Sequence, residues 1–120
     1  MASVILLGLE NDLAQSLTTL LRRLSHDVTV TNSLTQSLGD RRARVVFAGG
    51  DGPDYREIVR KLTAERPDAA VIVVNRLPDN TRWLDALELG AADYCGAPFE
   101  SNQINWLMTG ALRGLAGAVA

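Results

Sequence analysis

Five short apolar runs alternate with five helical patterns along this 120-residue chain, and that alternation constrains the fold more than any other feature. The runs predict strands at Val4–Leu7, Asp27–Thr31, Val45–Ala48, Ala69–Val74 and Tyr94–Cys95. Continuous apolar strands are typical of a parallel sheet that is covered on both faces. Since crossovers between parallel strands are right-handed and place helices against the sheet, the sequence predicts an α/β fold of the (βα)5 type.

Four of the five predicted helices carry apolar residues at helical spacing, which form one buried stripe on each helix. The second predicted helix is short and has only a weak helical pattern. The first helix is capped by Asn11 or Asp12, and the second covers Asn32–Leu38 and ends at Gly39. The fourth is opened by Asp79-Asn80-Thr81, and the fifth by Ser101 or Asn102. The stripes are Leu13, Leu17, Leu20, Leu21 and Leu24 in the first helix, Tyr55, Ile58, Val59 and Leu62 in the third, Leu84, Leu87 and Ala91 in the fourth, and Ile104, Leu107, Met108 and Ala111 in the fifth.

Length, charge and cysteine content exclude several classes of protein. The chain fits one domain spanning residues 1–120, in which 111–120 is a fraying helix end or a linker. Its net charge of −2 provides no basic field, so we expect no direct binding of nucleic acid. No apolar run approaches the roughly 18 residues of a membrane-spanning helix. The single cysteine, Cys95, suits the reducing cytoplasm and is predicted to pack as an apolar residue.

Function on a parallel α/β sheet belongs in the loops at the carboxyl ends of its strands. In this chain those loops are Gly8–Asn11, Gly49–Pro53, Asn75–Arg76 and Gly96–Phe99. Their glycines do not match the spacing of a dinucleotide-binding or P-loop motif. Tight turns that need a positive φ therefore explain these glycines more simply than a phosphate-binding loop does.

The segment GAADYCGAPF, from Gly90 to Phe99, resembles the last strand and signature turn of response-regulator receiver domains, G-A-x-D-Y-x-x-K-P-F. Two other anchors match: the turn ENDL at 10–13 resembles the end of D-D-x-P-x-L, and Gly49 precedes Pro53 by four residues, as in D-x-x-x-P. The resemblance covers essentially the whole chain. It implies a flavodoxin-like, CheY-like fold with strand order 2-1-3-4-5, and a role in bacterial two-component phosphorelay signalling.

The resemblance also implies where phosphoryl chemistry would occur. In active receivers, carboxylates hold Mg²⁺, an aspartate accepts the phosphoryl group, a lysine balances charge, and a Ser/Thr and an aromatic residue act as a switch. The matching positions here are Gly8, Leu9 and Glu10 for the acidic turn, Gly49 for the phosphoacceptor, Asn75 and Tyr94 for the switch, Ala97 for the lysine, and Pro98 for a cis-proline. Gly49 has no side chain to phosphorylate. The resemblance therefore implies a degenerate pseudo-receiver that is not an enzyme.

Three alternatives stay open at this edge of the sheet. Asp51 is a candidate phosphoacceptor in a shifted register, although it would then lie in a loop. Glu10 and Asp51 are candidate ligands of a weak Mg²⁺ site, and otherwise solvated loop acids; no other cofactor is expected. The emptied acidic pocket is a candidate site for a small molecule or a nucleotide.

Trp83 and Trp106 fall outside the predicted apolar stripes. Large aromatic residues outside a core are candidates for an interface hot spot, although each can also lap over a neighbouring helix. The receiver resemblance implies self-association or a protein partner through the face formed by the fourth helix, the fifth strand and the fifth helix. We therefore expect a cytoplasmic interaction domain that contacts no membrane.

Overall fold

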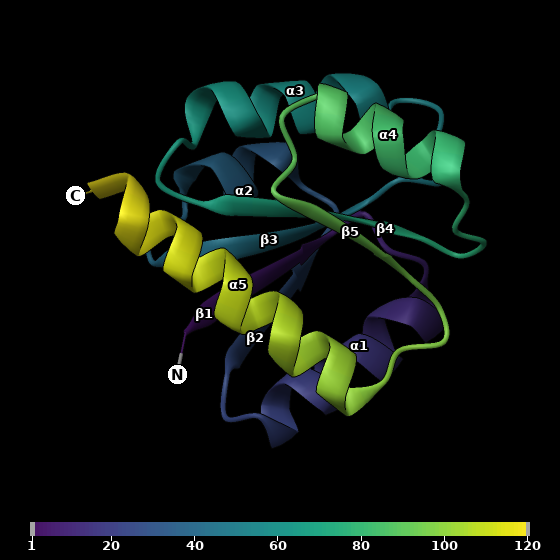
Figure 1. Cartoon of the computed structure of the whole chain (residues 1–120), viewed down its shortest axis with the longest axis vertical. Helices are drawn as coiled ribbons and strands as arrows, with labels where there is room; N and C mark the ends of the chain where they lie inside the picture. Colours follow the sequence, from purple (N-terminus) through teal and green to yellow (C-terminus); the bar gives the residue numbers. More distant parts are fainter. Residues whose placement is uncertain (1, 120) are drawn as a thin grey trace.

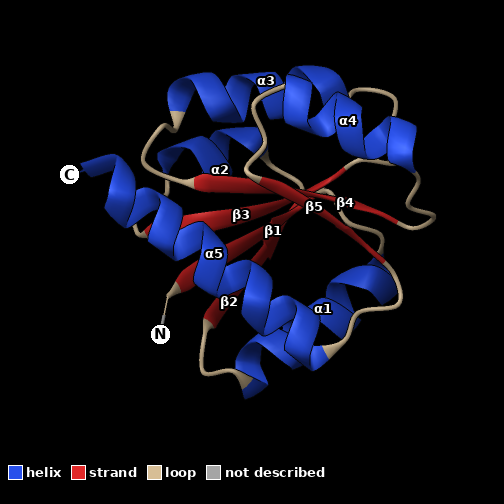
Figure 2. Ribbon diagram, in the orientation of Figure 1, coloured by secondary structure: helices blue, strands red, loops and turns tan. Residues whose placement is uncertain are grey.

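Five parallel strands form one sheet in the order β2-β1-β3-β4-β5, which confirms the predicted fold class and strand order. The structure, a computed structural model, describes residues 2–119. Helices α1 and α5 cover one face of the sheet, and α2, α3 and α4 cover the other (Figure 1, Figure 2). The strands are β1 (Ser3–Leu7), β2 (Asp27–Thr31), β3 (Ala43–Gly49), β4 (Ala70–Asn75) and β5 (Asp93–Gly96), and the helices are α1 (Asn11–Arg23), α2 (Leu34–Gly39), α3 (Tyr55–Glu65), α4 (Asn80–Glu88) and α5 (Ser101–Val119).

Alternate residues of the same strands build two separate apolar cores. Leu6 and Phe47 belong to the core under α1 and α5, whereas Leu7 and Val46 belong to the core under α2, α3 and α4. This division follows from the two-residue repeat of a strand, which sends successive side chains to opposite faces. Because both faces are covered, every residue of β4 is buried, as the continuous apolar run predicts.

Helix α4 departs from the predicted pattern. The sequence predicts Leu84 and Leu87 in a buried stripe, but their side chains are 56% and 40% exposed. This prediction is wrong because the small side chain of Ala86 is the one that α4 buries against the domain. The two leucines are instead exposed, as is Trp83, which precedes Leu84 directly and lies four residues before Leu87 on the same helix.

The helix starts agree with the sequence predictions in α4 and α5 but not in α1 or α2. Helix α2 begins at Leu34 after an N-cap at Ser33, not at Asn32, because the Ser33 hydroxyl accepts the backbone N–H of Gln36 in the first turn. Asp79 caps α4 as predicted, with its carboxylate accepting a backbone hydrogen bond in the first turn. In α1, however, the N-cap is Glu10, which makes no capping bond through its side chain, and Asn11 is already helical. The predicted cap by Asn11 or Asp12 is therefore wrong. The Asp12 carboxylate accepts a hydrogen bond from Arg76 instead, at 2.7 Å.

Three further sequence predictions concern the ends and the interior of the chain. Helix α5 begins at Ser101, as predicted, and continues to Val119, so the 111–120 stretch is helical as far as it is described, and Ala120 lies outside the described residues. Cys95 is buried, and this burial raises the pKa of its thiol to about 12, which confirms its apolar role. Within residues 2–119, no helix has the length and apolar character needed to cross a membrane.

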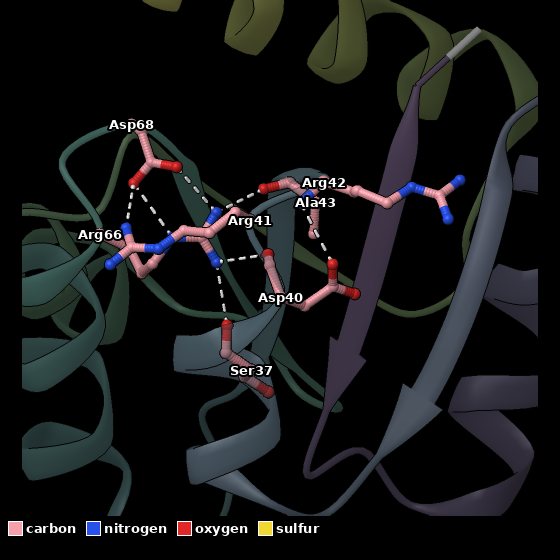
Figure 3. Close-up of polar contacts among 7 residues, drawn as sticks. All are labelled: Ser37, Asp40, Arg41, Arg42, Ala43, Arg66 and Asp68. Atoms are coloured by element: carbon pink, nitrogen blue, oxygen red, sulfur yellow. Dashed lines mark hydrogen bonds and ion pairs between the residues drawn. The ribbon is translucent and has the colours of Figure 1, made fainter.

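A fully buried arginine fastens the amino-terminal edge of the sheet (Figure 3). Arg66 follows α3, and all five of its N–H donors are used. They reach the backbone carbonyls of Ser37, Asp40 and Ala43 at 2.7–2.9 Å, and both carboxylate oxygens of Asp68 at 2.9 and 3.0 Å. The guanidinium thus ties the end of α2 to the start of β3 and to the turn before β4.

Candidate functional site

The ends of β1 and β3 meet where the strand order reverses, which is the usual place for a ligand in this class of fold. Leu7 pairs with Ala48, so Gly8 and Gly49 leave the sheet side by side. Gly8 has a φ of +70°, a conformation that favours glycine. Its carbonyl oxygen lies 2.4 Å from where a Cβ of Gly49 would stand. The backbone of Gly8 therefore fills the space that a side chain at position 49 needs, the position that the receiver resemblance assigns to the phosphoacceptor.

At the positions that the receiver resemblance assigns to an acidic turn, this chain carries residues of other kinds. Gly8 has no side chain, and Leu9 is 9% exposed and packs into the core beside α1. Glu10 is exposed and supplies the first carboxylate after β1. The remaining cavity at this edge has a volume of about 190 Å³. Ligand pockets are usually about 300–1,000 Å³, so this volume gives the predicted small-molecule site little room.

Asp51 lies in the loop after β3, and both oxygens of its carboxylate are engaged. Oδ1 accepts a hydrogen bond from Nδ2 of Asn75 at 2.8 Å, and Oδ2 accepts one from the backbone N–H of Arg76 at 2.8 Å. Asn75 is 2% exposed, at the end of β4. Its amide is therefore satisfied by a carboxylate from the neighbouring loop.

Arg76 lies in the β4–α4 loop, and its guanidinium contacts the acids that follow β1. Its Nη2 lies 2.7 Å from Oδ1 of Asp12 and 3.2 Å from Oε2 of Glu10, and its Nε lies 3.3 Å from Oε1 of Glu10. The hydrogen bond from Arg76 lowers the pKa of Asp12 below its usual range. The same bond, with that to Glu10, raises the pKa of Arg76. One guanidinium thus neutralises two exposed acids, Glu10 before α1 and Asp12 in its first turn.

Tyr94, the aromatic switch position, lies in β5 and is partly buried. Its hydroxyl oxygen accepts a hydrogen bond from the backbone N–H of Asp79 at 3.3 Å, and burial raises the pKa of the phenol. Further along, the peptide bond between Ala97 and Pro98 is cis, as predicted. Gly96 packs against Pro78, whose Cγ lies 2.3 Å from where a Cβ would stand. The β4–α4 loop is thus held on β5 at two points.

Exposed apolar side chains gather on α4 and α5. Trp83 is 44% exposed and Trp106 is 72% exposed, which confirms the prediction that both lie outside the core. A hollow of about 420 Å³ lies between these two indoles and Tyr94. Leu84 and Leu87 extend the apolar surface along α4. We call Trp83, Leu84, Leu87 and Trp106 the α4–α5 patch.

Magnesium, which the receiver resemblance implies, does not fit the residues that form this edge. A hard cation needs several oxygen ligands. The acidic-pair positions are Gly8 and Leu9, and the nearby carboxylates bind Arg76. Among the side chains that the structure describes, no three of the His, Cys, Asp or Glu type gather closely enough to hold a metal ion. The weak site predicted from Glu10 and Asp51 would have to compete with Arg76 for both, and it stays a prediction.

Comparisons with solved structures place this fold among receiver domains, whereas no family model and no curated protein matches the chain by sequence. The chain is similar to the BeF3-activated receiver domain of DrrB, with 26% identity, a TM-score of 0.77, and coverage of 94% of this chain and 98% of that one. It is also similar to a CheY-like receiver domain protein from Methanospirillum hungatei JF-1, with 14% identity, a TM-score of 0.83, and 98% coverage of both chains. The third is the beryllofluoride-activated NtrC4 receiver domain dimer, with 18% identity, a TM-score of 0.81, and coverage of 96% and 99%.

Sequence reasoning missed two arginines that organise the two edges of the sheet. Arg76 contacts acids 64 and 66 positions earlier in the chain. Arg66 contacts carbonyl groups 23 to 29 positions earlier. Neither spacing is periodic, so no local pattern predicts the pairs. The available signal was weaker: Arg76 directly follows a strand that ends at the predicted site.

Proposed function

We propose that this chain is a receiver-like domain of bacterial two-component signalling that works without phosphoryl transfer and without enzymatic activity. It acts in the cytoplasm, by binding a protein partner or a second copy of itself. The receiver fold supports the signalling class, and the residues at the carboxyl edge support the loss of chemistry. The α4–α5 patch supports recognition as the remaining activity.

The observation that carries the proposal is the geometry at Gly49. A phosphoacceptor needs a carboxylate at the end of β3, and Gly49 has none. The carbonyl oxygen of Gly8 also leaves no space for a Cβ there. Asp51, the alternative acceptor, already accepts hydrogen bonds through both carboxylate oxygens. Ala97 stands where an active receiver has the lysine that balances charge in the transition state, and alanine cannot supply that charge.

Recognition through α4, β5 and α5 rests on the apolar character of that face. Exposed aromatic and aliphatic side chains that cluster together mark interaction surfaces more often than isolated ones do. Tryptophan is enriched among hot-spot residues because it fills a partner's pocket with a large apolar area. One structural neighbour, the NtrC4 receiver domain, is described as a dimer, which makes a second copy of this chain the first partner to test.

The chemical part is tested by incubation with acetyl phosphate and Mg²⁺, followed by intact-mass spectrometry. We expect no phosphoryl adduct on the wild-type chain. Asp51→Asn is the matched control, because it removes the one alternative carboxylate in the β3–α3 loop that contacts Asn75. An adduct that appears on the wild type and is abolished by Asp51→Asn would contradict the proposal.

The recognition part is tested by sedimentation of wild type, Trp83→Ala and Trp106→Ala. Each replacement should weaken self-association or partner binding by about 2 kcal/mol or more, the usual threshold for a hot spot. Val30→Ala is the matched control, because Val30 is 55% exposed on β2 at the opposite edge of the sheet. Equal losses in all three variants, or none in either tryptophan variant, would argue against this face.

A further inference from the structure

Three separate loops at the carboxyl edge of the sheet are joined by charged side chains of the chain itself. Glu10 comes from the β1–α1 turn and Asp12 from the first turn of α1, Asp51 comes from the β3–α3 loop, and Asn75 with Arg76 comes from the end of β4. Every one of these side chains has a partner within this group. The loops are therefore connected without any added ion.

Asp51 supplies the anion of this arrangement. Its carboxylate receives the side-chain amide of Asn75 and the backbone N–H of Arg76, each at 2.8 Å. Asn75 stands at the switch position, where a receiver directs a hydroxyl group toward the incoming phosphoryl oxygen. In this chain the side-chain amide of Asn75 already binds an anion, the carboxylate of Asp51, which lies two residues after Gly49.

Arg76 supplies the cation. Its guanidinium bridges Glu10 and Asp12, with the shortest contact at 2.7 Å. A divalent cation would need those carboxylates as ligands, and the guanidinium offers fixed, planar donors to the same oxygens. The side chain is 39% exposed, so these bonds order the loop more than they add to the overall stability.

We propose that Asp51 and Arg76 are this chain's own substitutes for the phosphoryl group and the divalent cation of an active receiver. Together they hold the β4–α4 loop in one conformation in the absence of any ligand. The loop leads to Asp79, which caps α4 and donates its backbone N–H to the hydroxyl oxygen of Tyr94. Fixing the loop thus fixes the start of α4, four residues before Trp83. The inference deepens the proposed function, because phosphorylation-independent recognition requires a surface that is always formed.

Amide hydrogen exchange followed by NMR tests the inference on the whole chain. The Arg76 amide should exchange more slowly than the neighbouring amide of Leu77, which donates no hydrogen bond within the described structure. Asp51→Ala and Arg76→Gln should each speed exchange at residue 76 by about tenfold, the effect of losing one ordering hydrogen bond. Amides of β4 serve as the reference that the fold is intact. Asp54→Ala is the matched control, since this exposed acid of the same loop makes no capping bond through its side chain.

Addition of Mg²⁺ with beryllofluoride gives an independent readout on the wild type. If the site carries its own anion and cation, amide shifts at residues 8–12, 50–52 and 75–77 should not change. Shifts that move on addition, or an Arg76 amide as unprotected as that of Leu77, would overturn the inference. An unchanged Arg76 exchange rate in a folded Asp51→Ala variant would also overturn it. Association through the α4–α5 patch is measured separately, so the two proposals can fail independently.

Discussion

Arg66 offers the sharpest test of what holds this domain together. Its side chain is completely buried, and its five donors serve three backbone carbonyls and the carboxylate of Asp68 (Figure 3). Replacement by methionine preserves much of the aliphatic volume and removes every donor. The carbonyl groups of Ser37 and Ala43 then remain buried without a partner, whereas Asp68 and the carbonyl of Asp40 lie closer to solvent and can be hydrated.

The expected loss follows from those two carbonyls. Each buried acceptor left unsatisfied costs about 1–3 kcal/mol. Two of them give about 2–6 kcal/mol, and removal of a buried charge offsets part of this cost. We therefore expect Arg66→Met to lower the free energy of unfolding by about 2–4 kcal/mol. Arg66→Lys should cost less, because lysine keeps the charge and three donors, but lacks the planar fork that reaches five acceptors.

Urea unfolding monitored by far-UV circular dichroism measures these differences directly. Arg60→Met is the control, because Arg60 is exposed on α3 and forms no ion pair with any residue in the described part of the chain. It should change the free energy of unfolding by less than about 0.5 kcal/mol. A loss below about 1 kcal/mol for Arg66→Met, with an unchanged dependence on urea, would refute the reasoning.

Two further predictions concern the opposite edges of the sheet. Gly49→Asp restores the acid of an active receiver, yet its Cβ would meet the carbonyl oxygen of Gly8 at 2.4 Å, so we expect a loss of about 1–3 kcal/mol in urea unfolding and no phosphoryl adduct; a stable variant that is phosphorylated would contradict this. The hydrogen bonds from Arg66 lower the pKa of Asp68 below its ordinary 3.8, so the stability that this carboxylate contributes is complete above pH 3.8 and is lost as the pH falls through the folded pKa. Asp68→Asn should unfold with a shallower pH dependence in acid, and an identical acid profile for the two chains would rule this out.

The fold could be predicted from sequence because its determinants are local and repeated. Apolar runs such as Val45–Ala48 locate the strands, and helical spacing as at Leu13 and Leu17 locates the helices. The side on which α4 is buried could not be predicted in this way. Leu84 and Leu87 form an apolar stripe, but periodicity does not show that the sheet accepts a small alanine there instead.

The candidate site was predictable only in its positions. Gly49, Asn75 and Ala97 follow from the spacing of three anchors, and the structure places the loops that carry them at one edge of the sheet. The contacts among them depend on folding, since Arg76 meets Asp12 across 64 residues of chain. Residue types alone also left Asp12 as a helix cap, because nothing local indicates that a distant guanidinium competes for its carboxylate.

The placement of the two tryptophans determines what the intrinsic fluorescence of this chain can report. The sequence contains only Trp83 and Trp106, and both indoles are substantially hydrated in the folded domain. Trp106, which is 72% exposed, should emit much as it does in an unfolded chain, so most of the change on denaturation should come from Trp83, which is 44% exposed. Contact with a partner would remove both rings from water and shift the emission to shorter wavelength. If the α4–α5 patch is the interface that we propose, the chain carries an optical probe of its own association.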